Sequence, residues 1–169
     1  GLLLETFCAE IISLGIKQLW VSIDSHLPEV HDRFRNKKGA FEKVIQGIEA
    51  VKRKRIDKRP FIVARAVIAK ENFELIGDYI DFFKNKVDAI TFQPLQKFSI
   101  FSMDNINRPS FLKEEDAPKL RDIIQTLSKK YSFLNSPYYK LMPDFIASSQ
   151  KLIDNNLFRC LVRSAFMLE

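Results

Sequence analysis

Along the first part of the chain, segments in which apolar residues recur at helical spacing alternate with short apolar runs that are typical of strands. Helical spacing predicts helices over residues 3–14, 39–54 and 72–84. Runs rich in β-branched and aromatic residues predict strands at 18–23, 61–68 and 88–93. Because a helix separates each pair of successive strands, the strands should be parallel, with right-handed crossovers. The sequence therefore predicts an α/β fold, which is either part of a parallel βα barrel or an open doubly wound sheet.

The periodic pattern stops after Pro94, and a different organisation follows. Residues 96–112 predict an irregular loop. Two helices are expected next, over 116–131 and 138–153, and Pro143 should kink the second helix or delay its start. A strand is expected to begin within 161–168. We accordingly divide the chain into an αβαβαβ segment at 1–95, a loop and helical extension at 96–157, and a short terminal segment at 158–169.

Polar residues interrupt the predicted strands near their carboxyl ends. In the first strand Trp20, Ser22 and Asp24 fall on one face by alternation, and Arg65 interrupts the second strand. Two further polar residues, Thr91 and Gln93, share a face of the third strand. Ligands of parallel α/β folds bind at the carboxyl ends of the strands.

Two interpretations of these polar residues remain open. A buried arginine is costly unless an anion pairs with it, so Arg65 favours a cavity for a carboxylate or phosphate ligand. The alternative is internal pairing, for example of Arg65 with Asp24. Asp24 is also a candidate cap for the turn that follows the strand. Gln93 is a candidate for a hydrogen bond to a neighbouring loop, and Thr91 is a candidate for ordinary packing within its strand.

His31 and Asp32 follow the first strand and invite comparison with an acid–base pair. Adjacent residues in a short helix point to different sides, so we expect them to organise the loop and not to form a catalytic dyad. The chain has no glycine-rich phosphate loop, because its glycines are isolated, and it has no HExxH, CxxC or GxSxG motif.

Composition narrows the functional classes further. The chain is 46% hydrophobic and 28% charged, as in ordinary globular proteins, and no apolar run approaches the roughly 18 residues that span a bilayer. Much of the net charge of +6 lies in residues 52–59. We interpret this cluster as a solvated helix end and not as a nucleic-acid site, because no aromatic residues interleave with it. With only two cysteines, Cys8 and Cys160, we expect a reducing, cytoplasmic setting and no membrane partner.

Four short segments, in unbroken order from Gly1 to about Leu95, resemble the radical S-adenosylmethionine (radical SAM) enzymes. The segments VSIDS at 21–25 and HDRFRNKKGAF at 31–41 resemble that family's "VSIDG…HDxxRGxGSF" stretch. The segment AVIAKEN at 66–72 is similar to its "TVVTKEN" strand-to-helix turn, and FQPL at 92–95 matches its "FQPL" strand end. The first residues, GLL, resemble those that follow the family's "TNG" element.

The resemblance implies a partial radical SAM barrel and its cofactors. The family cleaves S-adenosylmethionine reductively at a 4Fe-4S cluster to a 5′-deoxyadenosyl radical. By resemblance, Ser22 would lie near the ribose or amino-acid part of S-adenosylmethionine, and Arg35 or Arg65 would bind its carboxylate. Asp24 and Gln93 would line the cavity. An electron donor would be a further partner.

The C-terminal segment CLVRSAFMLE, residues 160–169, resembles the opening of a SPASM extension. In such enzymes the first cysteine, here Cys160, ligates an auxiliary iron–sulfur cluster, and the substrate is a peptide or protein. A free or buried thiol is the alternative for Cys160.

The family's CxxxCxxC motif is absent from this sequence. Three thiolates are needed to hold the 4Fe-4S cluster, so we expect the isolated chain to be a fragment that is inactive by itself. Its three strands alone would leave two open sheet edges. The alternative function is a degenerate barrel without a cluster that acts as a non-catalytic binding module.

Overall fold

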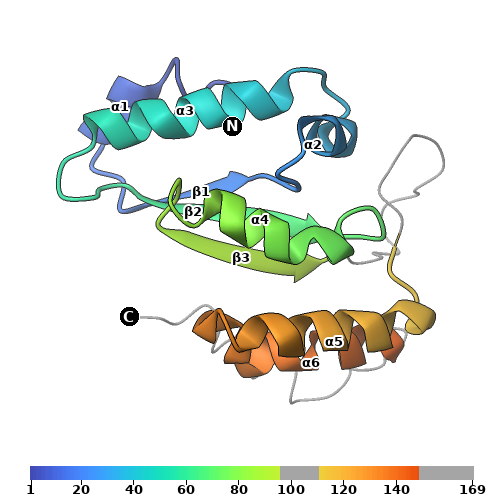
Figure 1. Ribbon diagram of the computed structural model, residues 1–169. Helices are drawn as coiled ribbons and strands as arrows, with labels where there is room; N and C mark the ends of the chain where they lie inside the picture. The colour runs from blue at the N-terminus through green and yellow to red at the C-terminus, as the bar shows by residue number, and fades with distance from the viewer. Residues whose placement is uncertain (96–110, 149–169) are drawn as a thin grey trace. The chain divides into compact units, whose positions relative to one another are not determined.

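A computed structural model describes residues 1–95 and 111–148 of the chain (Figure 1). Contacts divide the chain into two compact units, Gly1–Ser110 and Phe111–Glu169, and each unit is described here by itself.

The first unit alternates helices and strands. Its elements are α1 (Cys8–Ser13), β1 (Gln18–Ser22), α2 (Pro28–Arg35), α3 (Ala40–Lys54), β2 (Phe61–Ile68), the short helix η1 (Phe73–Leu75) with α4 (Ile76–Phe83), and β3 (Ala89–Pro94). The three strands form one parallel sheet in the order β1-β2-β3. The fold is therefore mixed α/β with parallel strands, as the alternating periods predicted.

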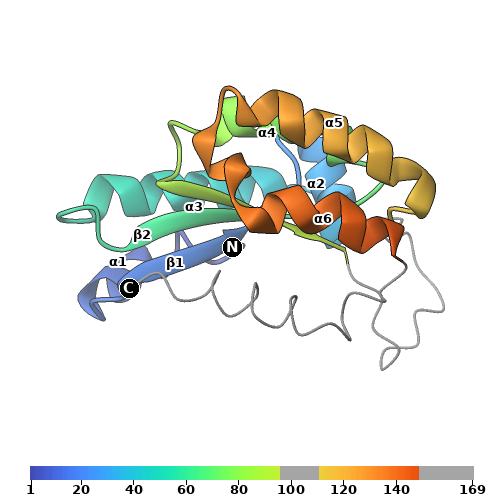
Figure 2. The ribbon, with the colours of Figure 1, turned by 90° about the horizontal axis from the view of Figure 1, so that it is seen from below.

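The crossover helices α3 and α4 pack against the same face of this sheet. Val44 of α3 lies close to Val21 of β1, because a Cβ placed on Gly1 would be 2.7 Å from a methyl group of Val44 and 3.5 Å from one of Val21. On α4, Tyr79 stacks edge-on against Phe92 of β3, with ring centroids 5.4 Å apart. Val21 and Phe92 belong to the same face, since their partners on β2, Ala64 and Ala66, are two residues apart. The ribbon views show the sheet as a layer with α3 along one side of it (Figures 1 and 2).

The core of this unit consists of residues from that sheet face and from the helices over it. Every second residue of β2 is almost fully buried, and so are the apolar faces of α3 and α4. The buried members include Val21, Ile23, Ile48, Val51, Ile62, Ala64, Ile68, Ile80 and Phe83. The opposite face of the sheet carries the polar strand residues Ser22, Arg65, Thr91 and Gln93.

Two helices differ from the sequence-based expectation. The first helix is shorter than the predicted 3–14, because residues 2–7 form turns and α1 begins only at Cys8. The sequence pattern gave no bounds for α2, although a short helix was considered at His31 and Asp32. The helix begins with Pro28, whose missing N–H costs nothing at the first helical position, and Asn36 ends it in the left-handed conformation (φ 48°).

A buried ion pair fastens the end of the sheet at which the strands begin. Arg55 binds both carboxylate oxygens of Asp88, with Nη2 3.0 Å from Oδ1. Asp88 also accepts a hydrogen bond from the Ile62 N–H (2.8 Å), and Arg55 donates to the Pro60 carbonyl (3.0 Å). Burial acts to raise the pKa of Asp88, but the bonds from Arg55 and Ile62 outweigh it and lower that pKa.

The second unit contains α5 (Ala117–Ser128) and α6 (Pro137–Ala147), preceded by the short helices η2 (Glu114–Asp116) and η3 (Ser132–Asn135). Arg121 of α5 forms an ion pair with Asp144 of α6. The helix α5 is shorter than the predicted 116–131, and α6 begins one residue before the predicted start at 138. Pro143 does not delay α6, which begins at Pro137 and contains Pro143 as a buried interior residue.

Three further expectations concern parts of the chain outside the described residues: the body of the loop at 96–110, the end of the helix predicted at 138–153, and the strand predicted at 161–168. Among the residues that the structure describes, no helix is long and apolar enough to cross a membrane.

Candidate functional site

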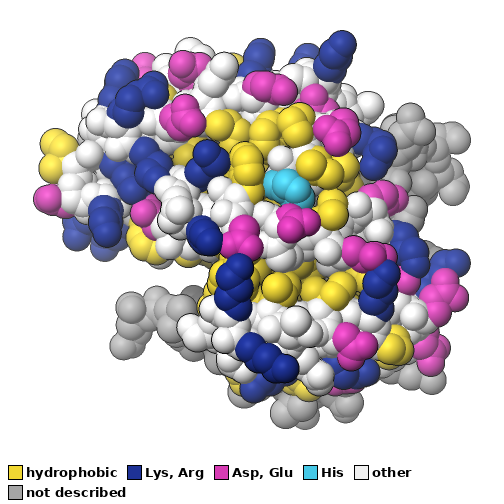
Figure 3. Space-filling model, in the orientation of Figure 1, with side chains coloured by type: hydrophobic (Ala, Val, Ile, Leu, Met, Phe, Trp, Pro, Cys, Tyr) yellow, Lys and Arg dark blue, Asp and Glu magenta, His cyan; other side chains and the backbone are white. Residues whose placement is uncertain are grey.

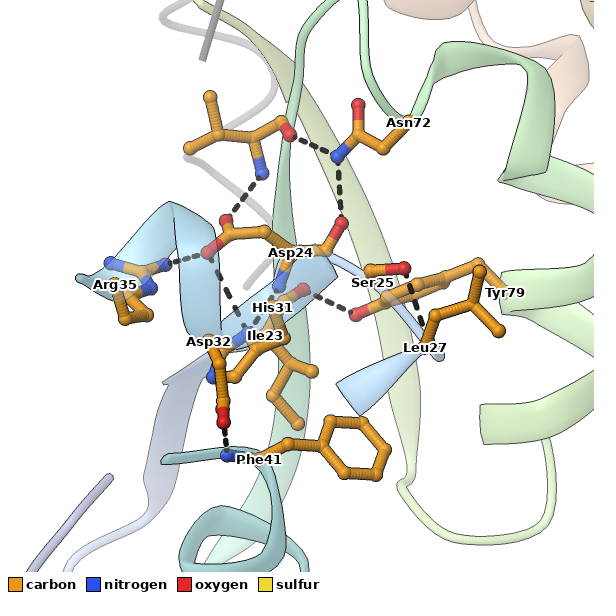
Figure 4. Close-up of polar contacts among 11 residues, drawn as sticks. Ile23, Asp24, Ser25, Leu27, His31, Asp32, Arg35, Phe41, Asn72 and Tyr79 are labelled. Atoms are coloured by element: carbon orange, nitrogen blue, oxygen red, sulfur yellow. Dashed lines mark hydrogen bonds and ion pairs between the residues drawn. The ribbon is translucent and has the colours of Figure 1, made fainter. Parts of the chain in front are cut away.

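The carboxylate of Asp24 lies at the carboxyl end of β1, and each of its two oxygens contacts a partner (Figure 4). The Val67 N–H of β2 donates to Oδ1 (3.1 Å), so the side chain continues the β1–β2 ladder beyond the strand. Oδ2 lies 2.6 Å from Nη2 of Arg35 on α2. Asp24 is 2% exposed and Arg35 is 38% exposed. Burial raises the pKa of Asp24, and the Arg35 charge opposes that shift.

His31 of α2 lies directly beneath this carboxylate. Its Nδ1 accepts a hydrogen bond from the backbone N–H of Asp24 (3.1 Å), which fixes the proton of the neutral ring on Nε2. The pKa of His31 is lowered to about 4, mainly because the ring is buried and to a smaller degree because of the charge of Arg35. The 3.8 Å approach of Nδ1 to Asp24 Oδ2 is therefore no ion pair near neutral pH. His31 positions the end of β1.

Asn72 and Tyr79 hold the same loop from the side of α4. The amide of Asn72 donates to the carbonyls of Asp24 (2.6 Å) and Val67 (2.8 Å), and its Oδ1 accepts from the Ala69 N–H (2.8 Å). Tyr79 donates its hydroxyl to the Ile23 carbonyl (2.9 Å). Asn72 stands at the N-cap position of η1 but makes no side-chain cap bond, and its amide ties the end of β1 to β2 instead.

Asp32 organises the start of α3, and does not join His31 in a dyad. Its carboxylate accepts hydrogen bonds from the N–H groups of Gly39 (2.5 Å) and Phe41 (2.9 Å). Burial acts to raise the pKa of Asp32, but these amide bonds hold it below its ordinary value. The expected loop-organising role is what the geometry shows. The turn after β1 is closed by Ser25, whose hydroxyl accepts from the Leu27 N–H (3.1 Å), and not by Asp24.

A row of polar residues crosses the sheet face that α3 and α4 leave free. Ser22 pairs in register with Arg65, and Arg65 pairs with Thr91. Gln93 is two residues farther along β3, so it shares this face. The guanidinium of Arg65 stacks on Trp20, 4.3 Å from the ring centroid. The structure therefore brings Ser22, Arg65 and Gln93 to one face, and keeps Asp24 and Arg35 together at the strand end.

The anticipated pairing of Arg65 with Asp24 does not form, because Asp24 is already bound to Arg35. Within the described residues no carboxylate forms an ion pair with Arg65. The stacked contact with Trp20 is worth about 0.5–1 kcal/mol at a partly exposed site and leaves the planar donors of Arg65 available. Arg65 is the cation at this face with the capacity to bind an anion.

The pocket at the strand ends is small. A cavity of about 10 Å³ lies between Asp24, Ser25, Asn72 and the side chains of β2, β3 and α4 around them. This volume holds about one water molecule. S-adenosylmethionine does not fit there, and it would have to lie along the sheet face that carries Ser22 and Arg65. The fit of this chain to S-adenosylmethionine thus rests on Ser22, Arg65 and Gln93.

The residues of this chain do not fit a 4Fe-4S cluster. Cys8 is a buried residue of α1, and Cys160 lies outside the described residues. Over residues 1–95 and 111–148, no three side chains of the metal-binding types gather at one point. A cluster with three thiolate ligands would need cysteines from outside this sequence.

Sequence reasoning missed the buried network around Asp24. The sequence assigned His31 to a loop, and Asn72 and Tyr79 to a helix. Their hydrogen bonds to the end of β1 were not predictable, because such bonds join segments up to 56 residues apart. One signal was present: Pro28 followed by Glu29, with Arg33 and Arg35 a turn or more later, is typical of a helix from its first turn to its last.

No protein-family model matches this chain, and no curated protein matches it.

Proposed function

We propose that this chain is part of a radical SAM enzyme and contributes the binding surface for S-adenosylmethionine but not the cluster ligands. The motif-like segments at 21–25, 31–41, 66–72 and 92–95 support the proposal. They coincide with the carboxyl end of β1, with α2 and the start of α3, with the end of β2, and with the end of β3. These are the positions at which a parallel βα fold binds its ligands.

The observation that carries the proposal is the polar row on the free face of the sheet. Consecutive parallel strands in the order β1-β2-β3, with α3 and α4 on one side, form a segment of the kind from which βα barrels are built. The free face would be the interior of such a barrel. Ser22, Arg65 and Gln93 would project into it, which suits a ligand that has both polar and anionic groups.

The residues take distinct roles in this proposal. Arg65, stacked on Trp20 and without a carboxylate partner in the described residues, would bind the carboxylate of S-adenosylmethionine. Ser22 and Gln93 would hydrogen-bond its polar groups. Asp24 and Arg35 would act indirectly, because their ion pair fixes the end of β1 and the start of the following turn. The cluster would supply the electron that cleaves the cofactor, and a peptide or protein would be the substrate.

The first test is to sequence the natural reading frame on both sides of this chain. The proposal predicts a CxxxCxxC motif about 80 residues before Gly1, a span set by two further βα units, and more cysteines after Glu169. A frame without the cysteine triplet would overturn the proposal.

The second candidate function is a non-catalytic binding module built on the same fold. The ion pair of Asp24 with Arg35, its hydrogen bond from Val67 and the water-sized cavity favour it, because they leave no room for a ligand at the strand end. The reading frame separates the two candidates, since a binding module needs no cysteine triplet. Isothermal titration with S-adenosylmethionine is a second discriminator, and Arg65→Gln should weaken binding only under the first proposal.

A further inference from the structure

Two exposed aliphatic side chains mark the end of the α/β unit at which the strands begin. Ile56 is 74% exposed and Leu14 is 73% exposed, the highest values for large hydrophobic residues among those described. Leu14 follows α1 just before β1, and Ile56 follows α3 just before β2. The two loops lead into neighbouring strands, because the Phe61 N–H donates to the Lys17 carbonyl (2.9 Å) at the start of the β1–β2 pair. We call residues 14–17 and 53–59 the amino-end surface.

Cations surround the two aliphatic side chains. The amino-end surface has five exposed basic residues and one exposed carboxylate, that of Asp57. The exposed cations are Lys17, Arg53, Lys54, Lys58 and Arg59. The remaining cation, Arg55, is turned inward onto Asp88. Figure 3 shows Lys and Arg side chains gathered at this end of the unit.

The loop that presents Ile56 is held in place. Ile56 and Arg59 form an antiparallel bridge, with the Arg59 N–H 2.9 Å from the Ile56 carbonyl. Asp57 (φ 50°) and Lys58 (φ 55°) both lie in the left-handed region, as in a two-residue hairpin turn. Each of these conformations costs about 1 kcal/mol or more in residues other than glycine. The anchor from Arg55 to Asp88 fixes the base of the turn, so Ile56 is held outward.

We propose that the amino-end surface binds anionic lipid bilayers peripherally. Leu14 and Ile56 would enter the boundary between headgroups and acyl chains, and the five cations would lie among the lipid phosphates and carboxylates. This surface is far along the strands from the polar row, so binding is independent of the proposed enzymatic function. It is also distinct from a membrane span, which none of the described helices could form.

The aliphatic side chains decide between a bilayer and a nucleic acid. A single strand of nucleic acid is bound by cations that alternate with aromatic side chains on which bases stack. Residues 14–17 and 53–59 include no aromatic residue, and the one exposed ring that follows them, Phe61 (38% exposed), stands alone at the start of β2. A phosphodiester backbone offers nothing apolar to receive Ile56 or Leu14. A bilayer offers both an anionic surface and an apolar layer just below it.

The test is flotation of the full chain with vesicles of phosphatidylcholine, with and without phosphatidylserine. Binding should require phosphatidylserine and should weaken as salt is raised. Ile56→Ser and Lys54→Glu should each weaken binding about tenfold. Matched controls are Leu3→Ser, which removes another exposed leucine, and Lys43→Glu, at the opposite end of α3. Both controls should bind like the wild type. Circular dichroism verifies that all four variants fold.

Three outcomes would overturn the proposal. The first is no flotation with phosphatidylserine vesicles at low salt. The second is flotation that all four variants reduce equally, which would indicate non-specific charge attraction. The third is tighter binding to an RNA oligonucleotide that Ile56→Ser leaves unchanged, which would indicate a nucleic-acid surface.

Discussion

At the scale of single residues, the buried carboxylate of Asp24 depends on one cationic partner, Arg35. Removing Arg35 would leave a carboxylate that is 2% exposed without a counter-charge. Breaking a fully buried pair costs about 3–5 kcal/mol, but Arg35 is partly solvated and the pair is partly screened. We therefore predict that Arg35→Ala lowers the free energy of unfolding by about 1–3 kcal/mol, as measured by urea denaturation.

A double-mutant cycle checks the origin of that effect. Asp24→Asn keeps an acceptor for the Val67 N–H and removes the charge. In this background Arg35→Ala should cost about 1 kcal/mol or less. An equal cost in both backgrounds would show that the ion pair with Asp24 is not the cause.

His31 gives a second prediction at the residue scale, on pH dependence. Its folded-state pKa is about 4, below the value of about 6.5 in an unfolded chain. As pH falls from about 6.5 to 4, the unfolded chain binds a proton that the fold does not, so stability falls by about 2–3 kcal/mol. The raised pKa of Asp24 acts in the opposite direction, because the fold then takes up its proton first.

The variant His31→Asn isolates the histidine contribution. The asparagine oxygen is placed to accept from the Asp24 N–H, as Nδ1 does, and it does not titrate. Urea denaturation from pH 7.5 to 4.5 should show a smaller loss of stability for this variant than for the wild type. Parallel pH profiles for the two proteins would contradict the assignment of a neutral, buried His31.

At the scale of elements, α3 and the turn at residues 1–5 are packed through a glycine. A Cβ on Gly47 would lie 2.7 Å from Leu4 Cβ and 3.2 Å from the Glu5 backbone nitrogen. In an open helix Gly→Ala would stabilise by about 1 kcal/mol, but here overpacking should outweigh that gain. We predict that Gly47→Ala destabilises the fold by about 1–3 kcal/mol in thermal denaturation. Gln46→Ala, on the exposed side of the same helix, should be neutral or slightly stabilising.

The elements also show how far sequence reasoning extends. The strand β2 and the helix α3 follow the predicted bounds closely, because a long apolar run and a full amphipathic period define them. The bounds of α2 were missed, since the helix is short and strongly polar. Its side chains His31 and Arg35 contact Asp24, which lies at the end of β1. Contacts of this kind depend on the tertiary arrangement, and no local pattern contains them.

The candidate site was predictable only in part for the same reason. Alternation along single strands grouped Ser22 with Trp20 and Thr91 with Gln93, and the register then aligned Ser22, Arg65 and Thr91. The partner of Arg65 was not predictable. Its contact with Trp20 depends on how neighbouring strands align, and the engagement of Asp24 depends on a helix that the sequence did not reveal.

At the scale of the whole molecule, the sheet has two edges, β1 and β3, to which the described residues add no further strand. Open edges of a parallel sheet favour pairing with other chains. We predict that the isolated chain self-associates as its concentration rises, which sedimentation velocity would detect. A monodisperse monomer that unfolds cooperatively would count against a partial barrel.

The most direct test of the central proposal is the reaction of the protein encoded by the complete natural reading frame. After anaerobic reconstitution with iron and sulfide, it should release 5′-deoxyadenosine from S-adenosylmethionine when a reductant is added, and Arg65→Gln should weaken the binding of S-adenosylmethionine. A reconstituted protein that binds no iron and forms no 5′-deoxyadenosine would contradict the account and favour a binding module.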